Sequence, residues 1–362
     1  MGKKSALWLI AGACLLILGL ILMTIAMAAC NWDLTGLGTT TYETNTHSIT
    51  GKFTGISITT DTSAIVLAPS SDGKCKVVCY EQENAKHAVS VENDSLTITE
   101  VNNREWHDYI SINVGSPKIT VYLPDDEYAS LIIRVGTGAV KIPEDFRFGQ
   151  IDISASTGDI QNRASALNSI KIKTSTGRIH VENVSADALD LSVSTGNMTV
   201  SGVTCKGDIS IKVSTGKAHI TDTKCENLRS DGNTGDLILQ NVIAEADVSI
   251  ERSTGDVTFD NCDAGKIFVK TSTGDVTGSL LTEKVFITQT DTGDIDVPHT
   301  TTGGKCEITT GTGDIKIKIK YVQRARCKIM QCALRRYNYL RPADVGANCV
   351  RPRATKRRPY GF

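Results

Sequence analysis

The chain has 362 residues, of which 40% are hydrophobic and 22% charged, and these proportions exclude a disordered chain as the default. Thirty-one glycines, eight prolines and only 5% aromatic residues favour β structure with tight turns over a helical bundle. The net charge of −1 is unevenly distributed: residues 1–320 hold 28 Lys and Arg against 39 Asp and Glu, whereas residues 321–362 hold 11 against one. The acidic part would repel phosphates, so nucleic acid is not an expected partner.

Residues 7–29 form an uncharged apolar run of 23 residues, long enough to cross a hydrocarbon core of ~30 Å as a helix. Lys3 and Lys4 precede the run and Asp33 follows it. The positive-inside rule therefore predicts that residues 1–6 are cytoplasmic and that the C-terminal domain is extracytoplasmic. We predict a single-pass protein of the cell membrane.

Two other interpretations of this segment stay open. A cleaved signal peptide would have the same polarity, and Ala26-Met27-Ala28 resembles a cleavage site, but its apolar region is usually shorter. Met27-Ala28-Ala29-Cys30 resembles the lipobox of bacterial lipoproteins, whose cysteine is lipid-modified, although that motif prefers Leu in place of Met27. All three place the remaining chain outside the membrane.

The next two segments lead into the repeats. Residues 30–50 are rich in Thr, Gly and polar residues and are predicted to be a linker. Residues 51–130 have strand patterns at uneven spacing, as expected for irregular first coils and an N-terminal cap. The cluster Arg104-Glu105-Trp106-His107-Asp108-Tyr109 lies here and would either pack the cap or contact a ligand. No nucleophile motif accompanies His107 and Asp108, so they predict no catalytic pair.

A Thr-Gly pair recurs every 19 or 20 residues from residue 137 onward. The residues seven before and two after each glycine are apolar, and apolar and polar residues alternate on both sides, which is typical of strands with one buried face. Each repeat is therefore a strand, a turn and a second strand. The predicted structural turn glycines are Gly138, Gly158, Gly177, Gly196, Gly216, Gly235, Gly255, Gly274, Gly293 and Gly313.

One such repeat cannot bury its apolar face, whereas stacked repeats join their faces into a common core. We predict an all-β fold: a single-chain, β-helix-like β-solenoid of about ten 19–20 residue coils, regular over residues 131–320 and preceded by one transmembrane helix. Ile170, Leu189 and Ile209 should then form a vertical column. An immunoglobulin-like sandwich would lack the fixed period, and a propeller blade needs about 40 residues.

The residue after the glycine is aspartate in the last five repeats. Stacked carboxylates repel one another, so something must offset the repulsion. Either each aspartate accepts turn amides and stays hydrated, or Ca²⁺ binds between the coils. The candidate metal ligands are Asp236, Asp256, Asp275, Asp294 and Asp314. No other cofactor and no catalytic residue is predicted.

Cys205 and Cys225 each lie nine residues past their glycine and so occupy the same site in adjacent coils. That spacing allows either a disulfide or a stacked pair of free thiols. Most of the 11 cysteines are expected to be small buried hydrophobic residues. Cys75 and Cys79 lie ~13 Å apart along one predicted strand, too far for a bond within it.

The regular pattern ends with Ile and Lys alternating over residues 315–320. Lysines on a last strand discourage edge-to-edge aggregation, so the rod is predicted to end near Lys320. Residues 321–362 lack the repeat and are predicted to be a disordered basic tail, either an extension without function or an arm attracted to anionic wall polymers or lipid.

The repeats SASTGDIQ, ERSTGDVTF, KTSTGDVTG and TGTGDIKI, together with the N-terminal anchor, resemble a bacterial family known as "putative adhesins", a group of unknown function. The resemblance covers about residues 45–320. It implies a surface-exposed β-helix-like domain, adhesion or a role in envelope-stress regulation, and no catalytic residues. The basic tail departs from the family pattern.

The leading hypothesis is a non-catalytic cell-surface β-solenoid, an adhesin or surface-interaction protein, whose partner would be a cell-wall polymer or a surface protein. The alternative is an envelope-stress signalling accessory that acts through a membrane partner. A polysaccharide lyase or hydrolase is disfavoured because the coils have no room for long cleft-forming loops and aromatic platforms are few.

Overall fold

The computed structural model describes residues 3–29, 41–103 and 115–320. Helix α1 (Lys3–Ala29) includes an 18-residue window, Gly12–Ala29, with a mean hydropathy of 2.5 and 0% burial inside the protein. It is the one helix in the described residues that is long and apolar enough to cross a membrane. Its length and composition fit a single-pass anchor or a signal sequence.

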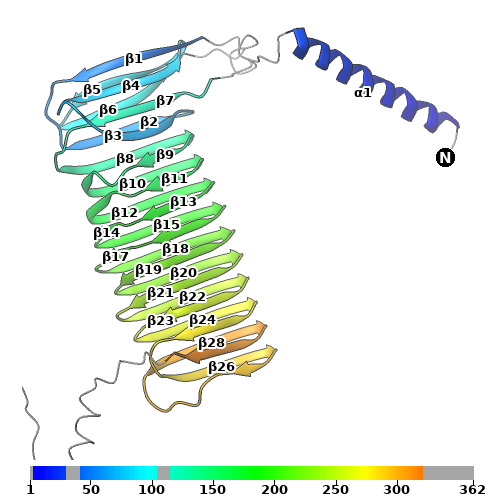
Figure 1. Ribbon diagram of the computed structural model, residues 1–362, viewed down its shortest axis with the longest axis vertical. Helices are drawn as coiled ribbons and strands as arrows, with labels where there is room; N and C mark the ends of the chain where they lie inside the picture. Colours follow the sequence, from blue (N-terminus) through cyan, green and yellow to red (C-terminus); the bar gives the residue numbers. More distant parts are fainter. Residues whose placement is uncertain (1–2, 30–40, 104–114, 321–362) are drawn as a thin grey trace, which may run out of the picture. The chain divides into compact units, whose positions relative to one another are not determined.

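Residues 41–103 and 115–320 form a β-solenoid in which two runs of stacked strands enclose one continuous apolar core (Figure 1). Sheet 1 contains, in stacking order, β5 (Ala85–Glu92), β6 (Ser95–Asn102), β2 (Gly55–Thr60), β8 (Tyr128–Thr137), β10 (Arg147–Thr157), β12 (Ser165–Thr176), β15 (Ala188–Thr195), β18 (Asp208–Thr215), β20 (Asn227–Thr234), β22 (Asp247–Thr254), β24 (Lys266–Thr273), β28 (Gly304–Thr312) and β26 (Lys284–Thr292).

Sheet 2 contains, in the same order, β1 (Tyr42–Ile49), β4 (Cys75–Gln82), β7 (Lys118–Leu123), β3 (Ala64–Pro69), β9 (Val140–Ile142), β11 (Ile160–Asn162), β13 (Ile179–Glu182), β16 (Met198–Ser201), β19 (Ala218–Cys225), β21 (Leu237–Ala244), β23 (Val257–Cys262), β25 (Val276–Leu280), β29 (Ile315–Ile319) and β27 (Ile295–Asp296). Two short strands, β14 (Ser185–Ala186) and β17 (Thr204–Cys205), lie in the segments that lead from sheet 2 back to sheet 1 in two middle coils, and they pair with each other.

The predicted columns are present. Ile170 pairs in register with Leu189, and Leu189 with Ile209, and all three side chains are buried. Alternate residues of each strand point into the core because side chains alternate across a pleated strand. The β-solenoid prediction is confirmed.

The Thr-Gly corners stack with equal regularity. Gly177 has φ +140°, and a Cβ there would lie 2.1 Å from the carbonyl oxygen of Gly158 in the preceding coil. Its amide donates to the carbonyl of Thr195 in the next coil, at 3.0 Å. A side chain is excluded at this corner both by the backbone angle and by the stacking distance.

The N-terminal end is built differently from the repeats. β2 and β3 form a first coil that stacks in parallel on β8 and β9, and β4 then pairs antiparallel with β7, and β5 with β6. The predicted linker is wrong in its second half, since residues 42–49 form β1, which pairs with β4 over eight residues. The side chains of β1 are polar and only half-buried, which is why hydropathy gave no strand signal.

At the C-terminal end, the last two coils stack in exchanged order. β28 and β29 insert between the coil of β24 and β25 and the outermost coil of β26 and β27, with all pairs parallel. The inserted coil buries Cys306, Ile308, Ile315 and Ile317, whereas Ile295 of the outer coil is 46% exposed. The more apolar coil therefore lies inside. The prediction that the Ile-Lys strand is outermost needs correction, although β27 covers only Ile315 and Lys316 of it.

Candidate functional site

The corner aspartates form a ladder along one edge of the rod. The carboxylate of Asp236 accepts the backbone amide of Asp256, Asp256 accepts that of Asp275, and the order then follows the exchanged coils through Asp314 to Asp294. These bonds have lengths of 2.8–3.3 Å. Backbone amides thus offset part of the repulsion between stacked carboxylates. Binding of Ca²⁺ by the ladder stays a prediction.

Two basic side chains that interrupt the ladder pair with it. Arg178 contacts Asp159 at 2.7 Å, and Lys217 contacts Asp236 at 2.9 Å. The hydrogen bond from Lys217 lowers the pKa of Asp236 and that from Arg178 lowers the pKa of Asp159, against a smaller opposing effect of desolvation. The ladder is therefore a mixed-charge edge and not a uniform anionic stripe.

Cys205, in β17, and Cys225, at the end of β19, are buried free thiols. The residues that precede them pair in register, Thr204 with Lys224, so the two cysteines follow equivalent positions of adjacent coils. The Cys205 thiol donates to the carbonyl of Asp187 at 3.3 Å. Burial raises the pKa of Cys225 to about 12, so its thiol stays protonated.

A hollow of about 460 Å³ opens on the outer face of sheet 1 where the repeat pattern is broken. Lys212, Arg229, Lys270 and Arg252 contribute to its lining, together with Asp231 and Glu251. Arg229 pairs with Asp231 at 2.9 Å, whereas Lys212 and Lys270 form no ion pair with any described residue. The lining thus has an excess of positive charge on a chain whose first 320 residues are acidic.

Arg252 occupies a core-facing position of the repeat and is only 4% exposed. It pairs with Gly232, whose missing side chain leaves room for the guanidinium group. Nη1 donates to the carbonyl of Gly235 at 3.1 Å and Nη2 to the hydroxyl of Ser230 at 3.2 Å, and Nε has no partner among the described residues. Burial lowers the pKa of Arg252, since desolvation disfavours the charged form.

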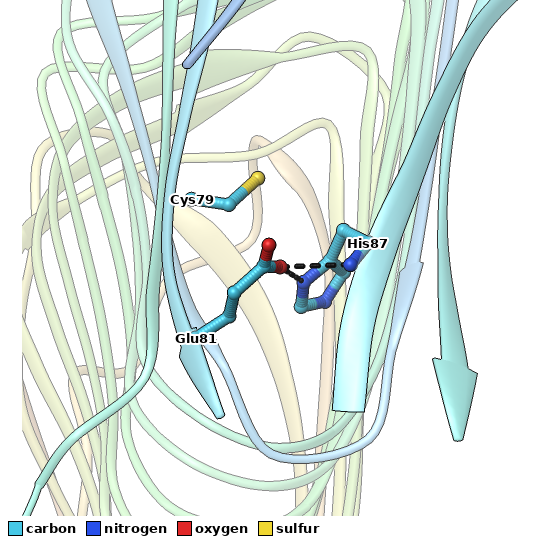
Figure 2. Close-up of side chains that lie close together, drawn as sticks. All are labelled: Cys79, Glu81 and His87. Atoms are coloured by element: carbon cyan, nitrogen blue, oxygen red, sulfur yellow. Dashed lines mark hydrogen bonds and ion pairs between the residues drawn. The ribbon is translucent and has the colours of Figure 1, made fainter. Parts of the chain in front are cut away.

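A second polar group lies inside the N-terminal cap, formed by Cys79, Glu81 and His87 (Figure 2). Alternation along β4 points Cys79 and Glu81 to the same, inner face, and the tight connection from β4 to β5 brings His87 opposite them. All three are buried, and one donor atom from each lies within 4.8 Å of the other two. Among the described residues, only this group brings three such donors together.

Hydrogen bonds fix the orientation of this group. Oε2 of Glu81 lies 2.6 Å from Nδ1 of His87 and 2.7 Å from its backbone amide, and Asn45 of β1 donates to Oε1 of Glu81 at 2.7 Å. On the other side of the ring, Nε2 lies 2.9 Å from the hydroxyl of Thr60, which donates to Glu100 at 2.8 Å. Desolvation and the nearby Glu81 charge raise the pKa of Cys79 to about 12.

The cap cluster and Arg252 were not predicted from the sequence. Arg252 could have been found by aligning the repeats, because it replaces an apolar or threonine residue three positions before the glycine. His87 gave no such signal, since its approach to Cys79 depends on the register of a hairpin. The predicted cluster of residues 104–109, the first part of the linker and the basic tail lie outside the described residues.

Comparison with solved structures finds similar chains from Parabacteroides and Bacteroides species, among others. A "putative adhesin" from Parabacteroides distasonis is 12% identical with a TM-score of 0.45, and the match covers 78% of this chain and 98% of that one. A "putative lipid binding protein" from the same species is 16% identical with a TM-score of 0.44 and the same coverage. A "putative adhesin" from Bacteroides fragilis is 13% identical with a TM-score of 0.41, covering 77% and 97%.

No curated protein matches the chain significantly. The family model described as "Toastrack DUF4097" matches residues 53–225 and 203–330, which together exceed half of the chain. These two matches include the first coil, much of the cap and all of the regular repeats. The chain is therefore a member of the Toastrack DUF4097 family.

Proposed function

We propose that this protein is a non-catalytic surface-interaction protein of the adhesin type, held at the membrane by α1 and binding an anionic cell-wall polymer through the outer face of sheet 1. The observation that carries the proposal is the basic hollow around Gly232. Lys212 and Lys270 project from the outer face without ion-pair partners among the described residues. They are free to pair with phosphate or carboxylate groups of a ligand.

The buried guanidinium of Arg252 strengthens this proposal. A buried charge without a counter-ion is destabilising, and no carboxylate of a described residue lies within 4.0 Å of Arg252. Asp236 and Asp231 only partly offset the positive charge of Arg252 at longer range, so this charge adds to the attraction of an anionic group in the hollow. The repeating surface on either side allows neighbouring units of a long polymer to lie along the rod, which adds avidity to weak individual contacts.

Binding of the full chain, purified in detergent, to isolated cell-wall fractions tests the proposal. The probes are polyphosphate and polygalacturonate as anionic polymers and dextran as a neutral one. We expect the anionic polymers and the wall fraction to bind and dextran not to bind, with affinity falling as salt rises. The double variant Lys212→Gln/Lys270→Gln should weaken binding about tenfold, as expected for two exposed charge pairs.

The matched control is Lys171→Gln/Lys173→Gln, which removes two exposed lysines from β12, two strands away from Lys212 on the same sheet and outside the lining of the hollow. If both double variants lose the same affinity for the anionic polymers, the loss reflects the change in net charge alone. That result would overturn the proposal that the hollow is the binding site. If no wall fraction binds, adhesion itself fails, and an accessory role through a membrane partner becomes the leading hypothesis.

A further inference from the structure

We propose that Cys79, Glu81 and His87 form a binding site for a transition-metal dication of the Zn²⁺ class inside the N-terminal cap. A thiolate, a carboxylate and an imidazole are the three side-chain groups by which proteins bind zinc. All three come from β4 and β5 and converge in a buried space (Figure 2). The thiolate and imidazole favour Zn²⁺ or Co²⁺ over Ca²⁺ and Mg²⁺, which prefer oxygen ligands.

The hydrogen-bond pattern indicates where the protons of this group lie. The Thr60 hydroxyl donates to Glu100, so it must accept a proton from Nε2 of His87. Oε2 of Glu81 already accepts the amide of His87, and its 2.6 Å contact with Nδ1 requires a second ring proton or a protonated carboxyl group. One proton is therefore shared between Glu81 and His87, and another is on the Cys79 thiol.

Metal binding would replace these two protons. The dication displaces the proton shared by Nδ1 and Glu81 and the thiol proton of Cys79, and both leave to solvent. Bonds then form from the metal to the sulfur, to a Glu81 oxygen and to Nδ1. The summed charge of the three side chains and the ion is unchanged, so the buried site gains no net charge. Because the net charge of the buried site is unchanged, much of the desolvation free energy that a buried ion would otherwise cost is avoided.

The surrounding residues already have the arrangement expected around a metal ligand. Metal-binding histidines usually donate their other ring nitrogen to a fixed acceptor, and here Nε2 donates to Thr60, which Glu100 holds in place. Asn45 fixes the other oxygen of Glu81. Thr60 and Asn45 are thus positioning residues.

Titration of the metal-free full chain in detergent with Co²⁺ and then Zn²⁺ tests the proposal. We expect a thiolate-to-cobalt charge-transfer band that disappears when Zn²⁺ is added, and release of about two protons per Zn²⁺. Cys79→Val should abolish this band and lower Zn²⁺ affinity at least ~100-fold, and Thr60→Val should lower it ~10–100-fold. Cys75→Val, which removes another buried thiol of β4, should leave both readouts unchanged.

Each result of the titration either supports the metal site or overturns it. The wild-type spectrum alone decides whether any thiolate site exists, so the test does not depend on the stability of a variant. A band that persists at full strength in the Cys79→Val chain would assign the metal to other cysteines and overturn the proposal. Absence of a band in the wild-type chain, or unchanged affinity in Cys79→Val, would leave the cluster as a purely structural ion pair.

Discussion

The N-terminal cap and the regular coils both shield the apolar core from water, but they do so with different strand arrangements. In the coils, identical positions stack in parallel, and columns such as Ile170, Leu189 and Ile209 need only apolar contact. In the cap, antiparallel strands cover the open end of the core and bury Glu81, His87 and Glu100 in a hydrogen-bonded group. The regular coils are therefore stabilised by apolar contacts between neighbouring repeats, whereas the N-terminal end of the rod depends on specific polar contacts.

The largest effect is expected in the cap. His87→Leu would remove the imidazole beside the buried carboxylates of Glu81 and Glu100 and leave them only neutral hydrogen-bond donors, so the free energy of unfolding should fall by about 3–5 kcal/mol. His180→Leu is the matched control in the coils, because its side chain is 38% exposed. It should change stability by less than ~0.5 kcal/mol. Urea unfolding of the full chain measures both, and equal losses would contradict a special role of the cap group.

The corner of a regular coil should be nearly as sensitive. Gly177→Ala combines an unfavourable φ of +140° with a Cβ only 2.1 Å from a backbone oxygen, and we expect a loss of about 3 kcal/mol. Gly73→Ala separates the two causes, since Gly73 has φ +69° with no atom within 4 Å of a Cβ. It should cost about 1 kcal/mol. If the two variants melt alike, stacking distance does not limit the corners.

How far the sequence predicts this molecule differs between the two regions. The 19–20 residue period fixes which residues share a column, so the core and the corners follow from spacing alone. The cap has no period: alternation places Cys79 and Glu81 on one face, but only the β4–β5 hairpin register brings in His87. The exchanged order of the last coils was also hidden, because both coils have the same Thr-Gly pattern and only their apolar content differs.

A smaller effect is expected along the aspartate ladder. Asp256→Ala removes the acceptor of the Asp275 amide and should cost about 0.5 kcal/mol, whereas Asp256→Asn keeps an acceptor, as Asn197 does for Lys217, and should be neutral. Thermal melting with and without Ca²⁺ should give the same melting temperature if amides alone satisfy the ladder. A rise with Ca²⁺ that Asp256→Ala abolishes would instead support a calcium site.

Acid should weaken the same ladder. The hydrogen bond from Lys217 lowers the folded-state pKa of Asp236, and the amide of Asp294 lowers that of Asp314. A lowered pKa means that this stabilisation is present above the ordinary carboxyl pKa of 3.8 and is lost as the pH falls through the folded-state value. Melting curves between pH 7 and pH 2 should show this loss, reduced in Lys217→Gln.

A small net change in stability, in contrast with His87→Leu, is also expected for Arg252→Met. Unlike His87, Arg252 has no carboxylate of a described residue within 4.0 Å, and the two that act on it at longer range, Asp236 and Asp231, are not buried, so its removal leaves no buried carboxylate unpaired. The loss of two hydrogen bonds and the relief of desolvation oppose each other, and the net change should lie within about 1 kcal/mol. Polyphosphate binding should nevertheless fall, because the buried cation that attracts the anion is gone. A strongly destabilised variant would mean that Arg252 is a structural residue that fills the space beside Gly232. A stable variant that binds polyphosphate as tightly as the wild type would mean that Arg252 does not contribute to binding of the anion.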